Sequence, residues 1–318
     1  MRLAAATLLV VVLAWVSLVV GVGDVTWRAF IPGVGGAEHD LLLISRIPRT
    51  LALILAGTAL SVAGLLMQML ARNRFAEPST TGTSESASLG VLAVMVLTPE
   101  LPVLGKMAVA AGFALAGTGL FLWVLRQIPL RSPLIVPLVG LMLGGVIESI
   151  TTFFAYRLEL LQSLNAWTMG DFSSVLRGRY ELLWFGFGLT LVAYVTADRF
   201  TLAGLGKGFM TNLGLNHGRV MALGLVIVSM VTATVVVSVG MIPFLGLIVP
   251  NLVSLRVGDN ARRSIPWVGI VGAGFVLACD VLGRIIRYPY EVPVGTVAGV
   301  LGSAAFLYLL LGSRARVG

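Results

Sequence analysis

The most constraining feature of this sequence is an apolar run from Leu51 to Leu70 that contains no charged residue. A bilayer core of about 30 Å is spanned by about 20 helical residues, which this run supplies. Arg46 and Arg49 precede the run and, three positions apart, share one face of a helix. The segment AEPS at 76–79 follows it and cannot continue a helix. Residues 46–83 therefore predict a membrane-spanning helix with a cationic mouth.

Composition extends this prediction to the whole chain. Of its 318 residues 58% are hydrophobic and 11% are charged, whereas about a quarter of a soluble domain is charged. The apolar runs do not alternate, which excludes a barrel. We predict an all-α polytopic membrane protein with about ten transmembrane helices, forming a single permease domain over residues 1–318. The ten predicted segments are 3–23, 47–70, 84–98, 104–125, 134–155, 181–197, 219–239, 243–256, 267–283 and 292–312.

Small residues predict how the second segment packs. Gly57, Ser61 and Gly64 follow one another at spacings of four and three, so they form a stripe on one helix face. Such a stripe lets neighbouring helices approach closely. The eighth segment is short and contains Pro250, which predicts a broken or half-length helix.

The orientation is predicted from arginine and lysine, which favour cytoplasmic loops. With the N-terminus inside, thirteen of them fall on the cytoplasmic side: Arg2, Arg72, Arg74, Arg126, Arg131, Arg199, Lys207, Arg219, Arg256, Arg262, Arg263, Arg314 and Arg316. Nine fall outside: Arg28, Arg46, Arg49, Lys106, Arg157, Arg177, Arg179, Arg284 and Arg287. The bias favours a multi-pass protein with both termini in the cytoplasm. It also explains the net charge of +8 without nucleic acid, which is not an expected partner.

Two loops are predicted to be structured. The outer loop at 157–180 contains LQSLNAWTMGDFSSV, whose mixture of apolar and polar residues indicates a short helix at the membrane interface. The inner loop at 198–218 carries glycines that favour two short helices joined by tight turns.

The chain offers little chemistry of its own. Its GLGKG segment at 204–208 lacks the spacing and the hydroxyl of a phosphate-binding loop. His39 and His217 stand in separate loops, and Cys279 is the single cysteine. We expect no catalytic residues, no metal, no cofactor and no enzymatic activity.

Two carboxylates lie within predicted membrane segments, where charge is costly and indicates function by default. Glu148 is flanked by Ser149 and Thr152, and is interpreted either as a buried hydrogen-bonded carboxylate or as a pathway residue. Asp280 precedes Arg284 by four positions, the spacing of a helical ion pair. A proton-coupled carrier would need more such groups.

Several motifs in order resemble the FecCD permease family of ATP-driven importers for iron–siderophores, haem and cobalamin. They are RIPR at 46–49, LAGTALSVAGLLMQ at 55–68, RNRFAEPSTTGTSESASLG at 72–90, WTMGDFSS at 167–174, NLGLN at 212–216, IPFLGLIVPN at 242–251 and EVPVGTVAGVLGS at 291–303. The resemblance implies a type II ABC importer fold like that of the cobalamin permease. It implies a bacterial cytoplasmic (inner) membrane location, two permeases that are identical or paralogous, two ABC ATPase subunits and an extracytoplasmic solute-binding protein.

The resemblance also bears on the cargo. Most members of the family have histidine where this chain has Asn251. Together with Phe244, this asparagine resembles the branch that handles catecholate siderophores, so ferric siderophore is the expected cargo. Haem or cobalamin remains the alternative. Secondary transport and membrane-bound catalysis compete with this interpretation but lack paired ion sites and a polar catalytic cluster.

Residue roles follow from the resemblance. Arg46, Arg49 and Arg284 match arginines that dock the binding protein at the outer mouth; lipid anchoring or pairing with Asp280 is the structural alternative. The turn formed by Leu213, Gly214, Leu215 and Asn216 matches the loop that couples to the ATPase. The alternative interpretation is an ordinary surface turn. Glu148 and Asn251 are possible pathway residues. Membrane lipid is a further expected partner.

Overall fold

The computed structural model describes residues 3–21, 36–128 and 135–314. Arg2, Arg28, Arg131 and Arg316, which enter the predicted charge balance, lie outside the described residues. The described helices are α1 Leu3–Val19, α2 Ala37–Leu41, α3 Ile47–Leu70, α4 Thr83–Leu97, α5 Val103–Gln127, α6 Ile135–Arg157, α7 Leu161–Thr168, α8 Leu182–Val195, α9 Ala197–Leu205, α10 Lys207–Asn212, α11 His217–Val239, α12 Leu245–Val257, α13 Ala261–Ile286 and α14 Val294–Arg314.

Ten apolar helices among the described residues coincide with the ten predicted segments. Five are long and apolar enough to cross a membrane: residues 38–70, α5, α6, α11 and α13. The other five, α1, α4, α8, α12 and the described part of α14, are shorter. The predicted all-α multi-pass architecture is confirmed, and the eighth segment is indeed short, with Pro250 inside α12.

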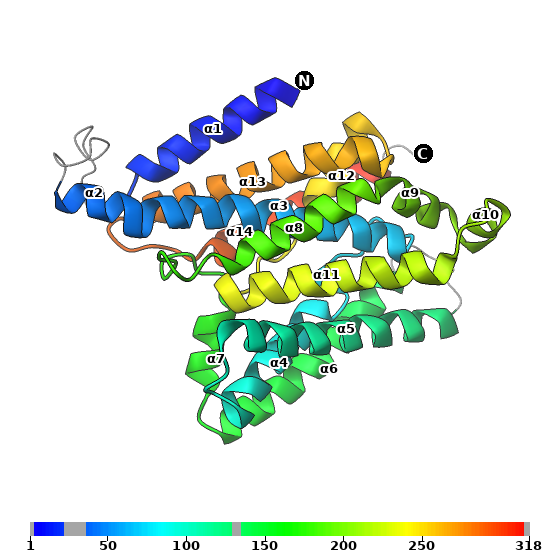
Figure 1. Cartoon of the computed structure of the whole chain (residues 1–318), viewed down its shortest axis with the longest axis horizontal. Coiled ribbons are helices and arrows are strands. Elements are labelled where there is room, and N and C mark those ends of the chain that lie inside the picture. The colour runs from blue at the N-terminus through cyan, green and yellow to red at the C-terminus, as the bar shows by residue number, and fades with distance from the viewer. Residues whose placement is uncertain (1–2, 22–35, 129–134, 315–318) are drawn as a thin grey trace.

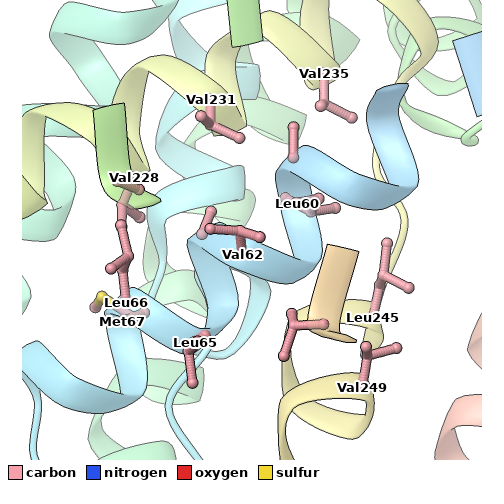
Figure 2. Close-up of a cluster of buried hydrophobic side chains, with 14 of the residues drawn as sticks. Leu60, Val62, Leu65, Leu66, Met67, Val228, Val231, Val235, Leu245 and Val249 are labelled. Carbon is pink, nitrogen blue, oxygen red and sulfur yellow. The ribbon is translucent and has the colours of Figure 1, made fainter. Parts of the chain in front are cut away.

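Helix α3 forms the centre of the bundle, packed against α8, α11, α12 and α13 (Figure 1). Figure 2 shows apolar side chains of α3, among them Leu60 and Leu66, facing Val231 of α11 and Leu245 of α12. In the most apolar window of the 38–70 span 83% of the residues are buried, against 28% for α6. The bundle is therefore organised around α3, whereas α6 presents most of its surface outward.

Glycines bring α3 close to two neighbours, as the small-residue stripe predicts. A Cβ atom on Gly64 would lie 2.2 Å from the Cα atom of Gly246 in α12. One on Gly57 would lie 2.7 Å from the carbonyl oxygen of Gly272 in α13. Any larger residue would force these helices apart, because real Cβ atoms do not approach so closely.

The second predicted segment differs in where its helix begins. The helical path starts at Ala37 and passes through one π-helical stretch at Leu42–Arg46 before α3. Pro48 has no N–H to donate four residues back to Ile44. The Ile44 carbonyl instead accepts from the backbone N–H of Arg177 at 3.0 Å. A loop distant in the sequence thus provides the donor that the Ile44 carbonyl lacks, and the helix continues past Pro48.

The two structured loops are also as predicted. The helix α7 lies within the loop at 157–180, and α9 and α10 form the two short helices of the loop at 198–218. Helix α7 and helix α10 lie at opposite ends of the bundle (Figure 1). We refer to these ends as the α7 end and the α10 end.

Candidate functional site

A buried cluster of charges joins α3 to α13 at the α7 end. Arg49 Nη2 of α3 lies 2.7 Å from Asp280 Oδ1 of α13, and Arg49 Nη1 lies 2.7 Å from Glu291 Oε2. Arg284 Nη2 pairs with Asp280 Oδ2, which confirms the ion pair predicted from their spacing. One fully buried carboxylate is therefore shared by two guanidinium groups, an arrangement that requires both cations to stay in place.

The same cluster reaches α1 through backbone carbonyls. Arg284 Nη1 donates to the carbonyl oxygens of Ser17 at 2.8 Å and Val20 at 2.7 Å. Arg46 Nη1 also donates to the Val20 carbonyl. These bonds satisfy the orphan carbonyls at the C-terminal end of α1, where cations are also favoured by the helix dipole. Three helices are thus tied together at one level of the bundle.

Burial distinguishes these arginines from surface cations. Arg46, Arg49 and Arg284 are 6%, 8% and 3% exposed. The structure brings all three together at the α7 end, and each has partners within the chain. The Glu291 side chain, 27% exposed, is the more accessible partner in this cluster. Their docking role remains a prediction, and contact with another protein would involve exchange of the partners they now hold.

A second buried carboxylate lies at the start of α12 and was missed in the sequence analysis. Glu77 is 1% exposed, and its Oε1 accepts from the backbone N–H of Phe244 at 3.0 Å and from the Ser79 hydroxyl. The same carboxyl group faces the N–H groups of Gly246 and Leu247. The first N–H groups of a helix have no partner within it and favour negative charge. Glu77 therefore caps a helix that begins far along the chain.

Two further carboxyl groups lie on α4 and α6. Glu148 is exposed on α6 and, with Thr152 and Tyr156, lines a hollow of about 500 Å³. Glu85 of α4 packs against Gly144 of α6, and its Oε2 has no hydrogen-bond partner among the described residues. In the single chain Glu148 is exposed and does not lie buried against neighbouring helices, and its role as a pathway residue remains a prediction. The structure adds Glu85, a half-buried residue at the start of a predicted segment whose Oε2 atom is buried.

Phe244 lies immediately before α12, and Asn251 lies about two turns into that helix. The Asn251 amide Nδ2 donates to the carbonyl oxygens of Arg74 and Leu247, each at 2.8 Å. Phe244 adopts the left-handed conformation with φ 62° and stacks on Phe306 of α14 at 6.5 Å. Both residues join α12 to its neighbours. A role of Asn251 in a pathway remains a prediction.

The turn after α10 protrudes at the other end of the bundle. Leu213 is 55% exposed, and Gly214 has φ 72° with no atom within 4 Å of the place a Cβ would take. The Leu215 N–H donates to the Met210 carbonyl at 3.0 Å, and Asn216 Oδ1 accepts from the Arg219 N–H at 3.1 Å, capping α11. The turn is therefore exposed at its tip and hydrogen-bonded at its base, as suits a rigid contact surface.

These arrangements are contacts that hold the helices against one another. Within the described residues no three His, Cys, Asp or Glu side chains gather as a metal site. What the residues provide is a tightly packed helix core, charged ties between helices and a protruding turn.

Comparisons with known proteins extend over the full chain. The petrobactin import system permease protein YclN of Bacillus subtilis is 46% identical over 315 residues, covering 99% of both chains. The ferric-anguibactin transport system permease protein FatD of Vibrio anguillarum is 39% identical over 300 residues, covering 94% of this chain and 95% of that protein.

A solved structure shares the fold. It is described as an inward-facing conformation of a metal-chelate type ABC transporter; it has a TM-score of 0.82 at 23% identity and covers 98% of both chains. The model of the FecCD transport family matches residues 8–312. With the packed helices described above and relatives similar over nearly their whole length, the chain belongs to the FecCD transport family of membrane permeases.

Proposed function

We propose that this chain is the permease subunit of an ATP-driven importer that carries ferric siderophores of the catecholate branch across the bacterial cytoplasmic membrane. The observation that carries the proposal is the full-length similarity to a petrobactin permease protein at 46% identity. ATP hydrolysis belongs to separate ATPase subunits, and the chain itself is not an enzyme. Cargo arrives on an extracytoplasmic solute-binding protein.

A second permease, identical or paralogous, covers α6 in the assembled importer. Helix α6 exposes Leu141, Met142 and Phe153 alongside Glu148. A carboxylate facing lipid near the bilayer centre costs roughly 2.5–3.5 kcal/mol on insertion scales, so such groups face a partner or a water-filled path. We place Glu148 on the cargo path between the two permeases, with Asn251 as a second pathway residue.

The α10 end is proposed to face the cytoplasm, with both termini on that side. The turn at Leu213, Gly214, Leu215 and Asn216 then meets the ATPase. Its exposed tip and hydrogen-bonded base support this role, because a coupling contact has to transmit displacement without deforming.

The α7 end is proposed to face outward and to dock the binding protein. Arg46, Arg49 and Arg284 are the proposed docking set, and Arg49 is approached through its partner Glu291. A carboxylate of the binding protein would exchange with Glu291 for the Arg49 guanidinium, since planar bidentate pairing favours arginine. Electrostatic docking of this kind acts mainly on the association rate and weakens with salt.

Uptake measurements test the function. Cells lacking their own permease would express this chain with its ATPase and binding protein, and receive ferric petrobactin, haem or cobalamin. We expect ATP-dependent accumulation of iron from ferric petrobactin and none of the other two. Haem or cobalamin uptake in its place would contradict the proposed cargo.

Reporter fusions test the orientation. Fusions after Val103, Leu158 and Pro289 should report outside, and those after Asn73, Leu205 and Asn260 inside. The further predicted junctions after Val22, Pro129 and Gly318 lie outside the described residues. A cytoplasmic report at Leu158 would contradict the ten-helix arrangement.

A further inference from the structure

Helix α3 is buried along its length except on one stripe. Apart from Met69 in its last turn, the residues of α3 that are not buried are Ile47, Leu51, Ile54 and Thr58. Their spacings of four, three and four place them on one face of the helix. Thr58 lies at the middle of α3. This face is therefore partly uncovered at the depth of the bilayer core, where no water is present to cover it.

A cavity of about 370 Å³ lies against this stripe. Its lining includes Ile54 and Thr58 of α3, Thr7 and Val11 of α1, Leu191 of α8 and several residues of α13. Among the described residues α1 packs mainly against α13 and hardly touches α8. Figure 1 shows α1 close to the bundle at its C-terminal end and diverging from it toward its N-terminus. The cavity is therefore a gap between α1 and α8, and we call it the α1–α8 groove.

The α1–α8 groove offers no free polar group to a ligand. Thr58 Oγ1 donates to the Gly269 carbonyl oxygen at 3.2 Å. The hydroxyl groups of Thr7 and Thr190 donate to carbonyl oxygens in the preceding turn of their own helices, at 3.1 and 2.6 Å. Of the described residues that line the groove, none is charged. A cavity of this composition excludes water and favours apolar ligands.

Polar side chains gather where the groove approaches the α10 end. Tyr194, in the last turn of α8, lines the groove and interacts with Arg262 in the first turn of α13. Arg262 Nη1 also lies 2.7 Å from Asp198 Oδ2. The two charges compensate each other. This rim therefore favours neither a cationic nor an anionic headgroup.

We propose that the α1–α8 groove binds one acyl chain of a membrane phospholipid, whatever its headgroup. Hydrocarbon surrounds the helices at this depth, and the groove presents apolar side chains to it from four helices. Its volume lies near the lower end of the range of about 300–1,000 Å³ for small-ligand sites, which suits a segment of one chain. The chain would cover Ile54 and Thr58 and would fill the space between α1 and α8. The binding of this chain is independent of the import function.

Photolabelling in vesicles tests the proposal. The permease, assembled with its ATPase in dioleoyl phosphatidylcholine, would receive a trace of phosphatidylcholine or phosphatidylglycerol that carries a diazirine in the middle of one acyl chain. Mass spectrometry of peptides after irradiation locates the label. We expect label on Ile54 and Thr58 with equal yield for the two headgroups, and none on Leu53, which is 0% exposed. Absence of label from α3, or labelling by one headgroup only, would contradict the proposal.

Matched tryptophan variants show whether the chain enters through the groove. Val11→Trp fills the groove from α1, whereas Val12→Trp adds the same side chain at the next position, which does not line it. The two valines are 58% and 50% exposed. We expect the label on α3 to be lost in Val11→Trp and kept in Val12→Trp, with unchanged label on the exposed Leu120 of α5 as the reference. Equal labelling of α3 in both variants would overturn the proposal.

A water-filled groove predicts a different result at Thr58. Thr58→Cys in a Cys279→Ala background carries the only thiol of the chain, at the lining of the groove. We expect a charged, membrane-impermeant thiol reagent to leave it unmodified in the folded importer and to modify it after denaturation. Modification of the folded protein would place water in the groove and overturn the proposal. Co-purification of the ATPase subunits with every variant separates these results from misfolding, and none of the readouts depends on the cargo.

Discussion

Arg49 of α3 and Arg284 of α13 hold opposite oxygens of the Asp280 carboxylate, which has no exposed surface of its own. This shared anion fixes the central helix of the bundle against α13 and, through Arg284, against α1. A buried carboxylate with two cations is costly to form, but removing it leaves both cations uncompensated.

Asp280→Asn should therefore destabilise the permease strongly. Loss of a buried charge partner typically costs about 3–5 kcal/mol. The control is Asp259→Asn, whose partner Arg74 is 61% exposed, and which should change stability by less than about 1 kcal/mol. Heating in detergent followed by size-exclusion chromatography measures both. Equal heat resistance of the two variants would show that the buried pair contributes no more than the surface pair.

Gly64→Ala should separate α3 from α12, because the added Cβ would lie 2.2 Å from the Gly246 backbone. Overpacking of this kind costs about 1–3 kcal/mol. Gly112→Ala adds the same methyl group on α5 with nothing within 4 Å, so it should be tolerated. The midpoint of thermal inactivation should fall for the first variant only.

Glu77→Ala should loosen the start of α12. It leaves the Phe244 N–H buried without its acceptor, which costs about 1–3 kcal/mol. Glu100→Ala, at an exposed position between α4 and α5, is the control. Faster hydrogen exchange at residues 244–247 in the first variant alone is the expected result. Unchanged exchange there would mean that Glu77 does not cap the helix.

Gly214→Trp should abolish uptake while leaving insertion intact, since the turn is exposed and distant from the packed core. Two effects combine: tryptophan at φ 72° strains the turn, and its bulk blocks a partner surface. Gly214→Asn is the matched control, because asparagine tolerates the left-handed conformation. ATPase stimulation by loaded binding protein should persist with asparagine and disappear with tryptophan. A fully active tryptophan variant would remove this turn from the coupling contact.

Glu148→Gln should reduce uptake without altering stability, because the side chain is exposed in the isolated chain and removal of its charge breaks no ion pair among the described residues. Ser149→Ala on the same turn of α6 is the control. Initial uptake rates at equal expression provide the measurement. Equal rates for both variants and the parent would place Glu148 away from the path.

Local patterns predicted much of this structure. Hydropathy located the ten apolar helices, the stripe of Gly57 and Gly64 predicted close packing, and the four-residue spacing predicted the Asp280–Arg284 pair. Each of these features depends on residues within a few turns of one helix. The residues that determine these features are close together in the sequence, so a short window of sequence contains them.

Features created by distant contacts were predicted only as one alternative among others, as for the pairing of Arg49 with Asp280, or were missed. Arg49 and Asp280 are 231 positions apart, and Glu77 meets Phe244 over 167 positions. Glu77 was interpreted only as part of a segment that cannot continue a helix, whereas it is buried against the N-terminus of α12. Similarly, the helix continues ahead of the predicted segment at 47–70, because the Arg177 N–H donates to the Ile44 carbonyl, which Pro48 cannot do. No local pattern contains these partners.

The separation of Arg49 from Asp280 also has a consequence in time. A ribosome adding about 5–20 residues per second needs roughly 10–50 s to make the 231 residues between them. During that interval α8, α11, α12 and most of α13 are added one after another, so α3 is at first without the helices that later surround it. Helix α3, which is buried in the finished bundle, must first be stable in contact with lipid. The mean hydropathy of 2.1 in the most apolar window of the 38–70 span is compatible with this. Asp280 and Glu291, the partners of Arg49 in the finished bundle, are made only near the end of synthesis.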